Sequence, residues 1–253
     1  MKTTEKKKLT NLSISLLTVL GILILWTVLA LIAGSSYILP SIPETIVSMG
    51  ELLITGEFYL SFLLTMLRSV IAFALSFSVA FLLSLLCYKK QTADRIISPI
   101  VGILRALPTV AVILLLLIWT NSEVAPVIVT MLVVLPTLKT EITNALNGLD
   151  KDVITMCKVF GVSKREVLKK VTVPQVLPAL LLSAGAGLAL NVKLMVAAEV
   201  LASTKNSIGN MLNFANFNLL VPRMLALVTL SVIACLVIEK AFKLISKKVG
   251  KWQ

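Results

Sequence analysis

Long apolar runs recur along this chain of 253 residues and limit its fold more than any other feature. A run of about 20 apolar residues suffices for a helix to cross the hydrocarbon core of a bilayer, where the backbone must satisfy its own hydrogen bonds. The chain is 58% hydrophobic and 14% charged, far from an average soluble domain. We therefore predict an all-α polytopic membrane protein with about six transmembrane helices. The runs that supply them are residues 14–32, 60–87, 96–119, 124–138, 176–201 and 219–245.

The first apolar run follows a basic stretch, residues 1–13, as the apolar region of a signal peptide also would. The run is about 20 residues long, which exceeds that region and is enough to span a bilayer. We interpret it as a retained first span. Residues 1–13 then form a cytoplasmic N-terminal segment, and residues 14–253 form a single transmembrane domain without an evident internal repeat.

The distribution of lysine and arginine predicts the orientation, because cationic loops are retained on the cytoplasmic side of a membrane. Nineteen of the 24 basic residues lie in four segments, whereas residues 35–59 carry glutamates and no basic residue. We therefore predict that both termini and residues 150–178 are cytoplasmic. We attribute the net charge of +12 to this topology and not to nucleic-acid binding. The cations are dispersed over the chain and are not interleaved with the aromatic residues that a nucleic-acid surface would carry. The four basic segments are residues 1–13, 89–95, 139–170 and 240–251.

Residues 150–178 are the longest charged segment in this apolar chain, and they contain an apolar stripe. Its members recur at the spacing of one helix face. Such a stripe on a cytoplasmic segment must be covered by another surface. The stripe consists of Val153, Ile154, Cys157 and Phe160.

Turn and cap residues divide this segment into two predicted short helices. Gly161 falls where a left-handed turn would end the first helix. Ser163 and Glu166 have the spacing of a capping box, which would start the second helix. Pro174 is then expected to prevent continuation as a regular helix.

Residues 155–178 resemble a known motif, the EAA loop of bacterial ABC importer permeases. That loop reads Glu-Ala-Ala, three residues, Gly, and later Ile-x-Leu-Pro. Here Thr155-Met156-Cys157 replaces Glu-Ala-Ala, but Gly161 and the Leu177-Pro178 pair agree. The sequence VAAEVLA at residues 196–202 is similar to a segment of the subgroup that carries sulfonates, taurine and nitrate.

The resemblance implies a MetI-like permease core in the bacterial cytoplasmic membrane and names its partners. These are two cytoplasmic ABC ATPase subunits, a second permease copy, an extracytoplasmic solute-binding protein and the lipid bilayer. The first short helix, residues 152–160, would be the coupling helix that docks into a cleft of an ATPase subunit. The implied coupling residues are Val153, Thr155, Met156, Cys157, Phe160 and Gly161.

Three of the ionisable residues within the apolar runs are candidates for the translocation pathway, because a charge there is costly and tends to face a polar cavity or a partner. Arg68 is interpreted either as structurally paired or as lining the translocation pathway. Lys193 could line the pathway or extend its flexible stem to the outer interface. Glu199, nearer the outer surface, could pair, anchor or contact solute. Lys193 and Glu199 are six residues apart and thus face different sides of one helix, so a mutual pair is not expected.

Two local patterns in the apolar runs each allow two interpretations. The triplet Leu-Pro-Thr occurs at residues 107–109 and 135–137, and each proline predicts a helix kink that could also form a gate. Small residues fill positions 183–187, which allows close helix packing, either within one chain or between two permease copies.

Catalytic and ligand-binding motifs are missing from the sequence. There is no histidine, no phosphate-binding loop and no Gly-x-Ser-x-Gly, and the three cysteines are scattered. We therefore predict no cofactor, no metal site and no enzymatic activity in this chain. ATP hydrolysis would belong to a separate subunit.

The predicted function is that of a permease subunit that moves a small solute inward by alternating access. The resemblance favours a small organic or inorganic anion, similar to a sulfonate, taurine or nitrate, or else a vitamin precursor. The alternative is a stand-alone secondary transporter or channel, but six spans without a repeat are few for a transporter built of two halves. An intramembrane enzyme would need acids, bases or metal ligands that are missing here.

Overall fold

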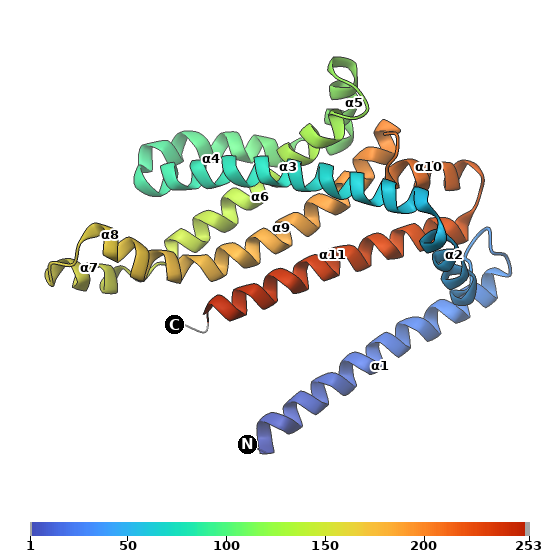
Figure 1. Ribbon diagram of the computed structural model, residues 1–253, viewed down its shortest axis with the longest axis horizontal. Coiled ribbons are helices and arrows are strands. Elements are labelled where there is room, and N and C mark those ends of the chain that lie inside the picture. The colour runs from blue at the N-terminus through green and yellow to red at the C-terminus, as the bar shows by residue number, and fades with distance from the viewer. Residues whose placement is uncertain (1, 251–253) are drawn as a thin grey trace. The chain divides into compact units, whose positions relative to one another are not determined.

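The computed structural model describes residues 2–250, and Figure 1 shows a succession of helices along this range. Met1 and Lys251, which belong to the predicted cytoplasmic termini, lie outside the described residues. The helices are α1 (Lys2–Ala33), α2 (Ile42–Ile54), α3 (Gly56–Lys89), α4 (Gln91–Ala106), α5 (Thr109–Trp119), α6 (Ala125–Asn147), α7 (Lys151–Val159), α8 (Lys164–Val167), the π-helical turn η1 (Leu168–Thr172), α9 (Val173–Ala202), α10 (Ile208–Phe217) and α11 (Val221–Gly250).

The chain divides into two compact units. The smaller unit comprises Met1–Gly56 and Leu212–Thr229, and the larger unit comprises Glu57–Met211 and Leu230–Gln253. The larger unit holds the helical core and residues 150–178, so it carries nearly all of the predicted site. Figure 1 shows α7 and α8, in yellow, at one end of the long helices α3, α6 and α9 of this unit.

Among the described residues, four helical segments are long and apolar enough to cross a membrane. They are α3, α6, the continuous segment Lys164–Ala202, and α11. These segments confirm four of the six predicted spans. Within α1, Leu17–Ala33 is a shorter apolar helix, which corresponds to the first predicted span.

The third predicted span, residues 96–119, is not one helix. It is broken into α4 and α5, which are bent by 92° relative to each other. Pro108 has no N–H to donate and disfavours helical geometry at Leu107, which adopts an extended conformation (φ −67°, ψ 129°). The expected kink is therefore a full break, and the two pieces count as a fifth span only when taken together.

The core of the larger unit forms where α3 and α6 run in the same direction beside α9. The Ser76 hydroxyl donates to the Met131 carbonyl (3.1 Å), and the Ser84 hydroxyl donates to the Lys139 carbonyl (3.1 Å). The equal spacing of these two contacts along both helices requires parallel helices. Small side chains on α3 make this approach possible. The buried cluster comprises Ala80, Val134, Leu138, Ile142, Leu146, Leu149 and Val176.

Pro174 does not end the second helix of the predicted coupling loop, which corrects the sequence-based expectation. Residues Lys164–Ala202 form one continuous helical segment. The π-helical turn Leu168–Thr172 precedes the proline, and the N–H of Val173 bonds to the carbonyl of Leu168. This wider turn changes the bonding pattern just before Pro174, which lacks an N–H and sits in the first turn of α9. The helix therefore continues past the proline.

Two glycines in the small-residue segment lie against helices of the same chain. A Cβ atom on Gly185 would lie 2.5 Å from Cβ of Phe242 in α11. A Cβ atom on Gly187 would lie 2.6 Å from Cδ2 of Leu138 in α6. Close packing within one chain therefore accounts for both positions.

In the smaller unit, the N-terminus of α2 is fixed by a capping box. The side chain of Ser41 accepts from the Glu44 N–H (3.4 Å), and the Glu44 carboxylate accepts from the Ser41 N–H (2.8 Å). The Ser36 hydroxyl also donates to Glu44 (2.7 Å). The bonds from Ser36 and Ser41 lower the pKa of the Glu44 carboxyl below its usual value. The indole of Trp26 in α1 donates to the Pro40 carbonyl (3.0 Å), which ties α1 to the chain before α2.

We predict that Gly185→Ala destabilises the protein by roughly 1–3 kcal/mol, because α9 and α11 must separate to admit the methyl group. Gly102→Ala is the matched control, since no atom lies within 4 Å of its Cβ position. Both substitutions replace a helical glycine by alanine and so raise helix propensity equally. The difference in thermal stability between the two variants therefore reports the contact with Phe242. The measurement is thermal unfolding of the detergent-solubilised chain. Equal midpoints for the two variants would contradict the prediction.

Candidate coupling loop and intramembrane charges

Helix α7 is fixed at its first residues by two side chains. The Asp150 carboxylate caps the helix by accepting from the N–H groups of Asp152 (2.9 Å) and Val153 (3.2 Å). The N–H of Asp150 in turn donates to the side-chain oxygen of Gln175 (3.2 Å), which belongs to α9. The start of α7 is thus linked directly to a membrane-spanning helix.

The last turn of α7 closes through Gly161, as the sequence predicts. Gly161 has a φ of +69°, in the left-handed region. Its N–H donates to the Lys158 carbonyl (3.1 Å), and the N–H of Val162 donates to the Cys157 carbonyl (3.0 Å). This pair of bonds satisfies the terminal carbonyls of the helix. The Ser163 hydroxyl then accepts from the Glu166 N–H (3.3 Å) and begins α8, which confirms the predicted cap.

The apolar stripe of α7 has two parts with different surroundings. Ile154 packs against the buried cluster of the larger unit, so this part of the stripe is covered within the chain. Val159 and Phe160, at the end of the helix, are 80% and 78% exposed, and Met156 is 56% exposed. Of the other predicted coupling residues, Val153 and Cys157 are half-buried and Thr155 is exposed.

Sequence reasoning missed Val159. This residue lies outside the stripe set by Ile154, and the motif comparison does not include it. The signal that could have found it is its place next to Phe160, immediately before the turn. Together, Met156, Val159 and Phe160 form an exposed apolar surface on a helix whose start is bonded to α9. A short helix presenting such a surface suits insertion into an apolar groove of a partner protein.

Glu199 is completely buried near the end of α9 and is paired there. Its carboxylate accepts a bond from the Thr65 hydroxyl (2.8 Å) and one from the Arg68 guanidinium (3.2 Å), both on α3. Structural pairing, one of the interpretations given for Arg68 and for Glu199, is therefore what the geometry shows. Their role in the pathway stays a prediction.

The same cluster joins two connections between helices. Arg68 also forms an ion pair with Glu123 in the connection between α5 and α6, and it donates to the carbonyl of Lys205 after α9 (3.4 Å). The N–H of Ile208, at the start of α10, donates to the Thr65 hydroxyl oxygen (3.0 Å). One arginine thus fastens α3 to two loops and to α9.

Sequence reasoning did not identify Thr65, Glu123 or Gly209 as members of this cluster. The N–H of Gly209 faces the Glu199 carboxylate at 3.5 Å. A Cβ atom on Gly209 would collide with Cβ of Glu199 and with the backbone of Glu199 and Val200. Only a glycine fits so close to another backbone.

Lys193 is exposed on α9, away from this cluster. Within residues 2–250 its ammonium group makes no hydrogen bond or ion pair. The exposed positions near it on α9 include Ala186 and Ala197. The structure therefore groups Arg68 with Glu199 but not with Lys193, and the role of Lys193 is untested.

Lys139 is not a residue of a solvated loop, which corrects its place in the count of cytoplasmic charges. It lies within α6 and is 6% exposed. Its ammonium group donates to Asp94 (3.1 Å) and to the hydroxyl of Ser98 (3.1 Å), both on α4. A buried lysine needs such partners, and they are supplied by a helix far away in the sequence.

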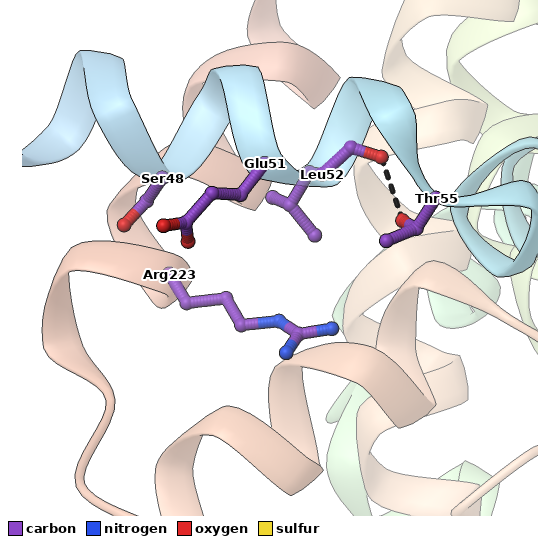
Figure 2. A pocket seen from close by; sticks show the side chains of 5 residues that line it. All are labelled: Ser48, Glu51, Leu52, Thr55 and Arg223. Carbon is purple, nitrogen blue, oxygen red and sulfur yellow. Dashed lines mark hydrogen bonds between the residues drawn. The ribbon is translucent and has the colours of Figure 1, made fainter.

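A small cavity of about 50 Å³ lies in the smaller unit, between α2 and the start of α11. Figure 2 shows the Arg223 side chain extending below Glu51, Leu52 and Thr55. The Thr55 hydroxyl donates to the Leu52 carbonyl (2.7 Å), which closes α2. The guanidinium carbon of Arg223 lies 5.9 Å from the centre of the Phe214 ring. The cavity is too small for an organic solute.

Comparison with known proteins decides the family. Residues 80–251 match the family described as the binding-protein-dependent transport system inner membrane component. The chain belongs to this family of ABC importer permeases. It is therefore a multi-pass inner-membrane transport subunit and not an enzyme.

Two relatives and one solved structure agree with membership in this permease family. The chain is 22% identical over 234 residues to the putative aliphatic sulfonates transport permease protein SsuC of Bacillus subtilis, covering 92% of this chain and 84% of SsuC. It is 26% identical over 163 residues to the formylaminopyrimidine transport permease protein ThiX of Halalkalibacterium halodurans, covering 64% of this chain and 65% of ThiX. An inward-facing structure of the MetNI methionine ABC transporter superposes with a TM-score of 0.62 at 20% identity, covering 74% of this chain and 93% of that chain. Because the sequence identity to MetNI is only 20%, this structural similarity shows a shared fold and no more.

We predict that Gly161→Ala lowers transport by the assembled importer several-fold while membrane insertion is retained. A left-handed residue other than glycine costs about 1–2 kcal/mol, so the end of α7 would shift to relieve that strain. Gly148→Ala, at the other end of the loop, is the control because Gly148 has a φ of −75°. Uptake into vesicles and the yield of inserted protein are the two measurements. Normal uptake by the Gly161 variant would show that the turn does not set the position of α7.

Proposed function

We propose that this permease imports a small anion, or a vitamin precursor, by alternating access driven by ATP hydrolysis on partner subunits. The observation that carries the proposal is the exposed apolar end of α7, Met156, Val159 and Phe160, on a helix whose start is bonded to α9 and whose end closes in a glycine turn. An apolar surface of this kind needs a partner. The proposed partner is a cytoplasmic ABC ATPase, and the complex contains two ATPase subunits and two permease copies.

The linkage between α7 and the membrane helices supports coupling by direct mechanical contact. Gln175 ties the start of α7 to α9, and Ile154 packs α7 onto the buried cluster that α6 shares with α3 and α9. When nucleotide-driven closure of the ATPases moves the paired α7 helices, α6 and α9 are displaced with them. The solute pathway then opens to one side and closes to the other.

The predicted orientation places α7 on the ATPase side of the membrane. Both termini and residues 150–178 are cytoplasmic by the distribution of basic residues. The Glu199 cluster, at the opposite end of α9, then faces outward, where an extracytoplasmic solute-binding protein delivers the solute.

The substrate class rests on the relatives and on one exposed cation. SsuC is named for aliphatic sulfonates and ThiX for formylaminopyrimidine, so the relatives span both an anion and a vitamin-type heterocycle. Lys193 stands on the exposed surface of α9 without a partner in the described chain. A single flexible ammonium group lowers the barrier for an anion without holding it tightly. We therefore favour a small anion.

Reconstitution tests the proposed function. The purified chain alone should show no ATP hydrolysis, and co-expression with its cognate ATPase should yield a stable complex. In proteoliposomes, uptake should require ATP and the solute-binding protein. Solute flux through the chain alone, driven by an ion gradient, would instead identify a stand-alone secondary transporter or channel. ATP turnover by the isolated chain would also overturn the proposal.

For the pathway role of Lys193, we predict that Lys193→Met lowers anion uptake severalfold without preventing assembly or ATP hydrolysis. Methionine keeps the length of the side chain and removes the charge, while Lys193→Arg should retain part of the uptake. Lys205→Met serves as control, because Lys205 is also exposed but lies in the connection after α9. Wild-type uptake by Lys193→Met would exclude the pathway role and leave Lys193 as an interfacial anchor.

A further inference from the structure

A polar cavity opens at the end of the larger unit that carries α7. Its volume is about 420 Å³, within the range of small-molecule sites and far above the space of a single water. Four helices supply its walls: the last turns of α3 and α6, and the first turns of α4 and α7. The lining residues are Cys87, Tyr88, Gln91, Asp94, Thr143, Asn147 and Lys151.

The charges in this cavity leave one cation unbalanced. The Asp94 carboxylate is paired with the buried ammonium group of Lys139 (3.1 Å) and also accepts from the Ser98 hydroxyl (2.7 Å). Lys151 makes no ion pair in the part of the chain that the structure describes. Two helices end at the cavity and two begin there, so their dipoles largely offset one another. Among the lining residues, Lys151 is therefore the charged side chain that is not paired with an opposite charge.

Neutral hydrogen-bond donors accompany this cation. The side-chain amides of Gln91 and Asn147 line the cavity and make no hydrogen bonds among residues 2–250. Each amide offers two donors, and the ammonium group of Lys151 offers three. A ligand that matches them carries a negative charge and several acceptor oxygens. Phosphate and its esters have this chemistry.

We propose that this cavity binds a phosphate-bearing anion, either the headgroup of an anionic phospholipid or a soluble phosphate ester. The neighbouring residues Lys89, Lys90 and Arg95 add positive charge outside the cavity and attract anions to this end of the protein. Tyr88, at the end of α3, has the character of a residue at the boundary of lipid and water. The site is separate from Lys193 and does not depend on the identity of the transported solute.

Occupancy of this site has a consequence for α7. Lys151 is the first residue of α7, whereas the other lining residues belong to α3, α4 and α6. A bound anion therefore bridges the start of α7 to three membrane helices. The anion would thus connect the start of α7 to the membrane helices at a second point, in addition to the hydrogen bond between Asp150 and Gln175.

Native mass spectrometry of the purified full-length chain tests the site with phosphatidylglycerol, with phosphatidylcholine as the neutral-headgroup reference. The wild type should retain phosphatidylglycerol in preference to phosphatidylcholine. Lys151→Gln should lose that preference several-fold. Lys158→Gln, which removes a lysine from the same helix outside the cavity, should keep it. Equal retention of phosphatidylglycerol by the two variants would overturn the proposal.

A second pair of variants removes donors without changing charge, and a soluble probe identifies the source of the anion. Asn147→Leu should weaken retention, and Asn144→Leu, an exposed position on the same helix, should not. Displacement of phosphatidylglycerol by millimolar glycerol 3-phosphate in the wild type, but not in Lys151→Gln, would support a site for soluble esters. Retention unaffected by glycerol 3-phosphate but sensitive to Lys151→Gln would support a lipid headgroup site. Retention insensitive to Asn147→Leu and Lys151→Gln would exclude the cavity.

Discussion

The membrane-spanning core depends on one buried carboxylate. Glu199 has no contact with solvent, and a carboxylate in that position is tolerated only with partners that satisfy its oxygens. Arg68 and Thr65 supply these partners from α3, and Arg68 extends the pairing to the connection between α5 and α6 and to the connection after α9. These bonds connect α3, α6 and α9 at the ends that lie away from α7. Farther along the helices, the bonds from Ser76 and Ser84 of α3 to carbonyls of α6 prevent the two from sliding past each other. The three helices therefore behave as one body.

A body fastened in this way transmits a displacement from one end to the other. At the end that carries α7, the link from Asp150 to Gln175 and the packing of Ile154 connect the loop to that body. The π-helical turn Leu168–Thr172 lies between the loop and the rest of α9. The bonding pattern of the long helix changes at this turn and again at Pro178, which has no N–H, so bending of the helix is expected to concentrate in this part. The loop is thus joined to the core in two ways. One is the hydrogen bond between Asp150 and Gln175, and the other is the continuous helical segment Lys164–Ala202, which contains the π-helical turn.

The sequence predicted the local features well because their causes are local. Gly161 and Ser163 mark the ends of the two helices through backbone conformation and capping, which neighbouring residues decide. Long-range features were less predictable. The triplet Leu-Pro-Thr breaks the chain at Pro108 but is absorbed within α6 at Pro136, where the carbonyl of Pro136 accepts bonds from Thr140 (3.0 Å) and Arg105 (3.4 Å) and the residue is buried. The same three residues therefore give two outcomes, and packing decides between them. Burial of Lys139 likewise depends on Asp94, which lies 45 positions away.

The break at Pro108 leaves backbone groups without helical partners, which bears on the proposed pairing of two permease copies. The first N–H groups of α5 have no partner within that helix, and its N-cap, Pro108, provides no side-chain bond. Lipid offers no hydrogen bonds, so broken helices at membrane depth occur only where protein or a water-filled cavity covers them. Leu107, next to the break, is 40% exposed. A water-filled pathway formed with a second permease copy would satisfy these groups and would also hydrate Lys193 on α9. The proposed aqueous path between two copies would thus accommodate both the uncovered N–H groups of α5 and the charge of Lys193.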